Sequence, residues 1–431
     1  MRMKLHKSSQ LMLVSAASLL AASLLTACSQ FTQTLTVDFV FVASARAAGT
    51  NNYGQIDVFE VNSESGAMRQ IPSSPFPSGG RNPVAEAVSA DNGSLFVINH
   101  DDNTIVQFTI GSDGKIYQFN TVNTPGVFPL AVATSSNNLF VVDTYEPLPT
   151  CSPAEPCTGS IAVYPLSKGT TATPAALGAP VNNASIGATY WPLTLPSNPA
   201  HIIVPTAVNV TASGAYVYVT AYDATVSPSV GYVYGYSVGT GGALTALSGS
   251  PYAAGTQPSS IASDAKSAYA YVTDFAGADV LAYSISATTG TLGKLIPLTT
   301  GTGGTNKFQA GNQPTSIVVD PSFAFAYVSN GQDSTVSAYS ISNGTLAGAG
   351  TSSANTNTYQ VGLEPVAIGI DPSTNHFLYT ANYLGSNLSS FELSQTNGTL
   401  VQGQGSPFDA NQLPTALVAI PHAGTGSGIS P

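Results

Sequence analysis

The sequence predicts an all-β fold, a seven-bladed β-propeller, and three observations support this prediction. Only 8% of the 431 residues are charged while 43% are hydrophobic, so the Ala, Glu, Lys, Leu and Arg surplus of long helices is missing. The 20 Tyr and 17 Phe exclude a disordered chain, which would be poor in aromatic residues. Finally, one unit of four short segments recurs along most of the chain, and such self-similarity indicates a repeat architecture.

The repeat is clearest in residues 314–330 and 365–382, which both begin with Pro, contain an Asp-Pro-Ser turn and end at an Asn. An alternating segment and a Gly-Thr-Leu turn follow each of them. The unit also begins at four other prolines, namely Pro83, Pro129, Pro205 and Pro258. Apolar residues at every second position between Gly, Asn and Ser turns predict four strands per unit. Sheets of this kind bury both faces when they are arranged radially.

The two ends of the repeat region complement each other. Residues 414–420 supply a first strand alone, whereas residues 39–43 and 56–59 supply a second and a third strand without a first. We therefore expect the C-terminal strand to pair with the N-terminal blade and close the ring. This places the propeller at residues 36–421, followed by a Gly- and Ser-rich flexible tail at residues 422–431.

The first 27 residues predict an export signal. Basic residues precede an apolar stretch at 11–25 that is too short for a comfortable membrane span. The sequence Leu-Thr-Ala before Cys28 resembles the lipobox of bacterial lipoproteins, which implies cleavage before Cys28 and lipid on its thiol. Residues 28–35 would then be a tether, and the protein would be anchored in the bacterial cell envelope, facing the periplasm or the exterior. The alternative is an ordinary secretory signal with a chance Cys.

Two further cysteines, Cys151 and Cys157, lie six residues apart in a Pro-rich segment. In an oxidising compartment this pair predicts a disulfide bond, with two free thiols as the alternative. We expect no metal site and no cofactor, because no second Cys pair or His cluster lies nearby.

The strand sequence Tyr-Val-Thr-Asp at 271–274, its counterpart at 327–330 and the Asp-Pro-Ser turns resemble the seven-bladed lactonase-like propellers. That superfamily includes Tyr-Val-Thr-Asn repeat proteins, propeller 6-phosphogluconolactonases and carboxymuconate cyclases. The resemblance implies a site with a Pro-Arg-His element at the start of a first strand and a Glu at the end of a second strand. No Arg or His follows any of the seven anchor prolines, and the second strands end without Glu. The family's catalytic set is therefore not carried over.

Long loops predict which face of the ring is functional, since loops on a rigid scaffold often carry function. We expect the insertions at residues 43–55, 143–160 and 223–231 on one face, together with a long entry to Pro205 that begins near Lys168 and holds Trp191. Three basic residues, Arg46, Arg81 and Lys307, belong to this face. The acidic residues assigned to it are Asp101, Asp102, Asp143, Glu146, Glu155, Asp223, Asp274, Asp279, Asp333, Glu364 and Asp409. Such a face, in a chain of net charge −11, disfavours anionic ligands and excludes nucleic acid as a partner.

One position within the repeat is unusual. Three residues after the anchor proline, six units carry Val, Ile or Leu, whereas the second unit carries Glu86. A carboxylate among apolar equivalents is costly unless it is paired. We therefore expect a pocket formed by Arg46, Arg81, Glu86, His100 and Asp101. The alternative is a Glu86–Arg ion pair that only seals the ring.

These observations favour a non-catalytic, lipid-anchored and monomeric propeller that binds a small molecule, a glycan or an envelope protein through its acidic, loop-rich face. The alternative is an exported lactonase-type hydrolase with a rearranged site, in which Glu86, His100 and Arg81 would be the catalytic candidates. A third possibility is a structural protein of the envelope without a small-molecule site.

Overall fold

A computed structural model describes residues 36–48, 51–148, 151, 154, 156–169, 174–295, 307–349 and 357–422. The predicted signal and tether at 1–35 and residues 423–431 of the predicted tail lie outside the described residues. Within the described part, the one helix is a three-residue 3-10 turn, Thr240–Gly242. None of the described helices is long and apolar enough to cross a membrane.

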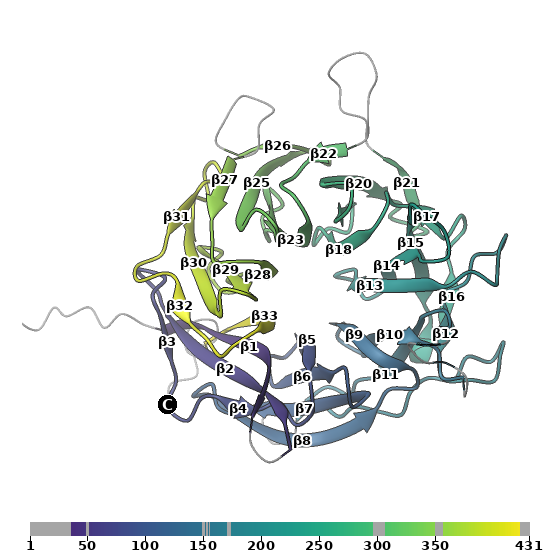
Figure 1. Cartoon of the computed structure of the whole chain (residues 1–431), viewed down its shortest axis with the longest axis horizontal. Helices are drawn as coiled ribbons and strands as arrows, with labels where there is room; N and C mark the ends of the chain where they lie inside the picture. Colours follow the sequence, from purple (N-terminus) through teal and green to yellow (C-terminus); the bar gives the residue numbers. More distant parts are fainter. Residues whose placement is uncertain are drawn as a thin grey trace, which may run out of the picture. The chain divides into compact units, whose positions relative to one another are not determined.

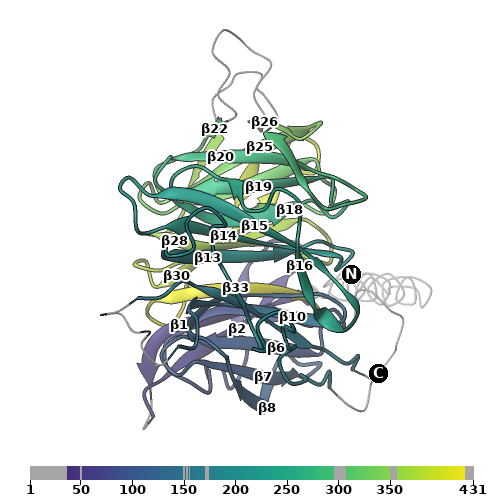
Figure 2. The same cartoon turned by 90° about the vertical axis from the view of Figure 1, so that its right-hand side faces the viewer.

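Seven antiparallel sheets surround one axis (Figure 1), which confirms the predicted seven-bladed β-propeller. Figure 2 shows the ring from its edge, with the strands running across its thickness. Each innermost strand contacts the innermost strands of both neighbouring blades. The sheet faces are therefore buried between blades, as the period-2 apolar pattern predicts.

The strands of the first three blades, from the axis outward, are as follows. Blade one contains β33 (Pro414–Pro421), β1 (Thr36–Ala48), β2 (Tyr53–Asn62), β3 (Met68–Gln70) and β4 (Phe76–Pro77). Blade two contains β5 (Pro83–Val88), β6 (Ser94–Asn99), β7 (Thr104–Ile110) and β8 (Ile116–Asn123). Blade three contains β9 (Val127–Thr134), β10 (Asn138–Tyr145), β11 (Ser160–Pro165) and β12 (Trp191–Pro192).

The other four blades each have an outermost strand in two short pieces. Blade four contains β13 (Ile203–Val210), β14 (Tyr216–Asp223), β15 (Val230–Val238), β16 (Leu244–Ala246) and β17 (Tyr252–Ala253). Blade five contains β18 (Pro258–Ser263), β19 (Tyr269–Asp274), β20 (Asp279–Ile285), β21 (Leu292–Leu295) and β22 (Lys307–Gln309). Blade six contains β23 (Pro314–Val319), β24 (Phe325–Asn330), β25 (Thr335–Ser342), β26 (Thr345–Gly348) and β27 (Asn357–Gln360). Blade seven contains β28 (Pro365–Ile370), β29 (Phe377–Asn382), β30 (Asn387–Leu393), β31 (Leu400–Gln402) and β32 (Phe408–Asp409).

The ring closes as predicted, through the pairing of the last strand with the first. In the β33–β1 pair, Val418 lies opposite Phe41 and Ala416 lies opposite Ala43. The hydroxyl of Thr415 also donates a hydrogen bond of 2.7 Å to the carbonyl of Pro83 in blade two. Blades one and two are thus joined by a strand from the C-terminal end of the chain.

A repeated contact fixes the loop that enters each innermost strand. The amide of Gly126 donates to the carboxylate of Asp143 at 3.2 Å, and the amide of Gly311 donates to the side chain of Asn330 at 3.0 Å. In both pairs the acceptor occupies the position opposite the anchor proline. A Cβ on Gly126 would lie 2.4 Å from the Cβ of Asp143, so only glycine fits there. The Gly-x-x-Pro spacing therefore sets the geometry of one face of the ring.

The structure corrects two expectations about the loops. Strand β1 continues to Ala48, so the connection to β2 is shorter than the predicted loop at residues 43–55. Trp191 and Pro192 pair with Ile161 and Ser160 as the outermost strand of blade three. Most of the insertion that begins near Lys168 therefore lies between the third and fourth strands, not before Pro205. The expectation that all insertions lie on one face was wrong for this segment.

Candidate active site

The site begins where strand β6 ends, at His100 and Asp101. The backbone amide of His100 donates to the carbonyl of Asn82 at 3.0 Å, which fixes the start of the turn. The ring nitrogen Nδ1 of His100 lies 2.7 Å from the Oδ1 atom of Asp101. Burial raises the pKa of Asp101, but hydrogen bonds from His100 and Asn82 outweigh it, so the net pKa lies below the ordinary value. Asp101 therefore stays ionised and orients the imidazole, leaving Nε2 for other partners.

Phe128 supports the imidazole from blade three. The two rings are stacked, with centroids 4.6 Å apart and an angle of 9° between their planes. Phe128 has a φ of 58°, a left-handed conformation that costs a non-glycine residue of order 1–3 kcal/mol. Its amide donates to the side chain of Asn103 at 2.7 Å, and its carbonyl accepts from the hydroxyl of Thr144 at 2.7 Å. The strained residue is thus held against His100 by contacts on both sides.

Glu146 is a carboxyl group of a different kind in the same sector. It follows Tyr145, whose ring centroid lies 6.1 Å from that of Phe128. Burial raises the pKa of Glu146, and no side-chain partner offsets this among the residues that the structure describes. Tyr190 belongs to the insertion of blade three. Burial raises the pKa of the Tyr190 phenol, and the nearby charge of Glu146 raises it further. The lowered pKa of Asp101 suits a carboxylate that orients a base, whereas the raised pKa of Glu146 suits a general acid.

Arg81 does not reach Glu86. Its Nη2 atom lies 2.5 Å from Asp102 Oδ1, and its backbone amide donates to Asp102 Oδ2 at 2.7 Å. The guanidinium is half exposed, and Arg46 is exposed on β1. Arg81, from the loop before β5, therefore contacts the turn that holds His100 and Asp101, while Arg46 makes no ion pair with them among the described residues.

Glu86 lies away from this turn, and the expected ion pair is absent from the described part of the chain. Both carboxyl oxygens are buried and lack a hydrogen bond of good geometry within the described part of the chain, although the residue as a whole is partly exposed. Burial raises its pKa well above the ordinary value, while the amides of Val418 and Ala43 act in the opposite direction. Its equivalent Ile261 packs between two blades. Glu86 thus lies at the seam between blades one and two and is not part of the candidate site.

The acidic face is also less charged than its sequence predicts. Asp143, Asp223, Asp274 and Asp279 are all buried. Burial raises the pKa of Asp143 to about 7, despite hydrogen bonds from Thr124 and Gly126. These residues fasten backbone loops rather than attract solutes. The sequence could not show this, because a strand-end Asp has the same neighbours in sequence whether it is buried or exposed.

Sequence reasoning missed a second His–Asp pair in blade four. The Nδ1 atom of His201 lies 2.6 Å from Oδ2 of Asp223, whose Oδ1 accepts the amide of Thr225 at 2.9 Å. The partners are 22 positions apart, and a scattered His gives no signal at that spacing. Phe128 was also missed, and Glu146 was assigned to the acidic face but not to the expected pocket.

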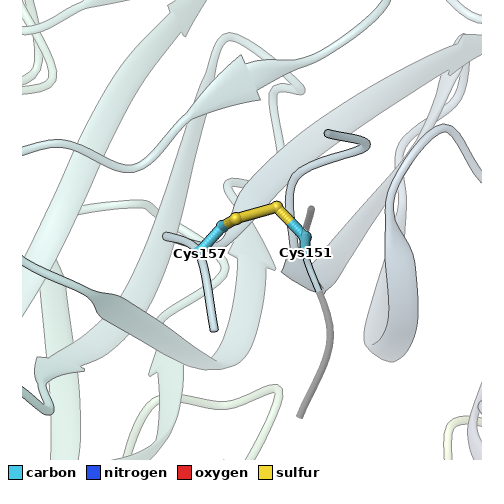
Figure 3. The surroundings of a disulfide bond; sticks show 2 residues. All are labelled: Cys151 and Cys157. Atoms are coloured by element: carbon cyan, nitrogen blue, oxygen red, sulfur yellow. A yellow bond between two sulfur atoms is a disulfide. The ribbon is translucent and has the colours of Figure 1, made fainter. Parts of the chain in front are cut away.

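The loop after Glu146 carries the predicted disulfide bond. Cys151 and Cys157 are joined through their sulfur atoms, with Cα atoms 5.4 Å apart (Figure 3). The amide of Glu146 donates to the carbonyl of Thr158 at 2.9 Å, so the loop begins and ends beside the site. No group of three or more His, Cys, Asp or Glu suited to a metal ion occurs among the described residues.

Fold and site together define a β-propeller with a His–Asp pair at the end of strand β6. Residues 40–406 match the family described as lactonase, 7-bladed beta-propeller. The chain belongs to this family, as the repeat motifs predict. No curated protein matches the sequence.

Solved structures with the same fold include several bacterial proteins. A candidate 6-phosphogluconolactonase from Bacteroides fragilis is 17% identical, with a TM-score of 0.64 over 90% of this chain and 99% of that one. A periplasmic gluconolactonase from Pseudomonas aeruginosa is 18% identical, with a TM-score of 0.63 over 89% of this chain and 99% of that one. At these identities the likeness concerns the fold alone.

Proposed function

We propose that the protein is a lactonase-type hydrolase that opens the ring ester of an uncharged lactone at the His100 site. The observation that carries the proposal is the His100–Asp101 pair, fixed by a strained Phe128, in a member of the lactonase propeller family. Membership of the family favours hydrolysis over the pure binding module that the missing Arg-His-Glu set suggests. The binding module remains a possible outcome of the experiment below.

The proposed reaction uses two residues in complementary roles. His100, with its Nδ1 proton bonded to Asp101, takes a proton from water through Nε2. The water oxygen attacks the lactone carbonyl carbon, and the bond from that carbon to the ring oxygen then breaks. Glu146, whose protonated form is favoured by burial, gives its proton to the leaving oxygen. The product is an open-chain hydroxy acid, and the proton on His100 returns to solvent or to Glu146.

Charge favours an uncharged substrate. Asp101, Asp102 and Glu146 lie in the sector, and the guanidinium of Arg81 is neutralised by Asp102. A phosphorylated lactone would find no unpaired cation among these residues, and acidic groups would repel it. The name of the Pseudomonas relative, a periplasmic gluconolactonase, agrees with an uncharged lactone and with export. We also propose export and lipid anchoring at Cys28, for which the sequence is the support.

The test compares lactone opening by the purified protein and matched variants. Acid release is followed by pH-stat titration with glucono-1,5-lactone and its 6-phosphate, after subtraction of the spontaneous rate. We expect turnover of the uncharged lactone and a loss of about 100-fold or more in His100→Asn, the usual contribution of a general base. His201→Asn, which removes the other His–Asp pair, is the control and should retain activity. Glu146→Gln should abolish the decline in rate at high pH that a general acid imposes.

Two outcomes would reject the proposal. One is a wild-type rate equal to the spontaneous rate for every lactone tested. The other is equal loss in His100→Asn and His201→Asn, which would indicate a structural effect. Ligand-dependent stabilisation without turnover would favour the binding module.

A further inference from the structure

A tyrosine fastens several of the seams between blades. The third residue of the second strand is Tyr218 in blade four and Tyr327 in blade six. Each hydroxyl donates to a glycine carbonyl in the next blade, Tyr218 to Gly290 at 2.5 Å and Tyr327 to Gly398 at 3.0 Å. In both cases the glycine lies in the turn between the third and fourth strands.

The same contact is missing between blades five and six. Tyr271 is the equivalent residue and is fully buried, yet its hydroxyl has no hydrogen-bond partner among the residues that the structure describes. The reason is the length of the facing turn. In blades five and seven the turn has residues 286–291 and 394–399, whereas in blade six only Asn343 and Gly344 separate β25 from β26. The shorter turn does not supply a carbonyl to Tyr271.

A pocket of about 170 Å³ occupies this seam. Its lining includes Tyr271, Gly344 and Asn343, with Asp264, Lys266, Tyr269 and Phe323 around them. The Nζ atom of Lys266 lies 5.0 Å from the centroid of the Phe323 ring. Asp264 Oδ1 accepts the amides of Ala268 at 2.6 Å and Tyr269 at 3.0 Å, which holds the carboxyl group in place. The pocket lies on the face of the short turns, opposite the His100 site.

We propose that this pocket binds a single uncharged sugar ring. Tyr271 and Lys266 supply hydrogen-bond donors, Asp264 supplies an acceptor, and aromatic rings supply the apolar surface that one face of a sugar needs. One carboxylate and one ammonium balance each other, so a charged ligand gains nothing. The volume lies below the roughly 300–1,000 Å³ of pockets for drug-sized ligands, which limits the ligand to about one ring.

The state of the phenol agrees with the donor role. Burial, together with the charge of Asp264 and the neighbouring Tyr269, raises the pKa of Tyr271. Its proton is therefore present throughout the physiological range. A buried donor without a partner is costly, and a ligand oxygen would remove that cost. The proposal does not depend on lactone hydrolysis, since the two sites lie on opposite faces of the ring.

The experiment has a part without ligand and a part with ligand. Without ligand, Tyr271→Phe should melt at or above the temperature of the wild type, because no hydrogen bond is lost and a buried donor without a partner is removed. The matched control, Tyr327→Phe, loses its bond to Gly398 and should melt at a lower temperature. With ligand, glucose is titrated by saturation-transfer NMR, and gluconate serves as the anionic comparison. We expect binding of glucose over gluconate and weakening of about 10-fold in Tyr271→Phe, as for the loss of one buried hydrogen bond.

Other results would overturn the inference. If the melting temperature of Tyr271→Phe is as low as that of Tyr327→Phe, the hydroxyl of Tyr271 already has a hydrogen-bond partner, for example buried water. Glucose affinity that is unchanged in Tyr271→Phe, or no binding of glucose, would remove the pocket as a sugar site. Lys266→Met gives a second check that leaves the seam intact, and it should weaken glucose binding without lowering the melting temperature.

Discussion

Replacing Glu86 by Leu should stabilise the protein, although most substitutions at buried positions destabilise. The carboxyl oxygens of Glu86 are buried at the seam of blades one and two without a hydrogen-bond partner. The six equivalent positions carry apolar residues. Among them is Ile261, which packs between blades four and five. A leucine should therefore fit the same space with no polar atom to desolvate.

The expected gain follows from two contributions. A buried polar group without a partner costs about 1–3 kcal/mol. Burying a Leu side chain contributes about 1.5–3 kcal/mol relative to leaving it exposed, less whatever the Glu methylene groups already contribute. Because these contributions overlap, we expect a net gain of about 2–4 kcal/mol near neutral pH.

The pH dependence has a definite sign. The pKa of Glu86 in the folded state lies well above its ordinary value of 4.5 because of burial. The contribution of Glu86 to the free energy of unfolding is largest below the pKa of this group in the unfolded chain. It decreases as the pH rises from that value to the pKa in the folded protein. The stability difference between Glu86→Leu and the wild type should therefore increase with pH above about 4.5.

Urea unfolding at several pH values measures this difference directly. Ile261→Glu is the matched control, because it places a carboxyl group at the equivalent seam and should destabilise with the same pH trend. If Glu86→Leu is less stable than the wild type at every pH, the carboxyl group has a stabilising partner such as buried water, and the reasoning fails.

Two other predictions concern the closure of the ring and the export signal. Burial and the neighbouring Asp371 raise the pKa of Asp38 to about 8, against hydrogen bonds from Ser373 and Tyr379, so this carboxyl group should lower wild-type stability as the pH rises from about 4 to 8. Asp38→Asn should show a smaller fall in urea unfolding over this range, because only the contribution of Asp38 is removed, and it should be more stable than the wild type above pH 8. An unchanged pH profile in Asp38→Asn would contradict the raised pKa of Asp38. Cys28→Ser should move the protein from the membrane to the soluble fraction. Lipid anchoring would be rejected if the variant stays in the membrane fraction and the wild-type protein carries no acyl chain.

Strand order and ring closure were predictable because they depend on local patterns. The anchor prolines and the two-residue alternation place each strand in its blade, and the unmatched strands at residues 39–43 and 414–420 identify the closure. Strand β12 gave no such signal, since two residues around Trp191 cannot show a periodicity. Its assignment depends on pairing with β11, which only the structure supplies.

The site was predicted only in part, for a related reason. His100 and Asp101 are adjacent in sequence, and Arg81 comes within reach of their turn because β5 and β6 are paired strands of the same blade. Glu86 lies at a similar sequence distance, but its strand phase directs it into the seam, where the amides of Val418 and Ala43 lie nearby. Phe128 belongs to the next blade, and its stacking on His100 depends on a positive φ that sequence does not indicate. Contacts between blades were therefore the main source of error.

The pairing of β33 with β1 also constrains the order of events during synthesis. Blade one lacks its innermost strand until residues 414–421 have left the ribosome, so the ring stays open while almost the whole chain already exists. Contacts of such large sequence separation form slowly, because the closure entropy of the loop must be overcome first. A circular permutant with new ends between two intact blades would convert this late step into a local hairpin, and it should fold faster than the natural chain while reaching the same ring.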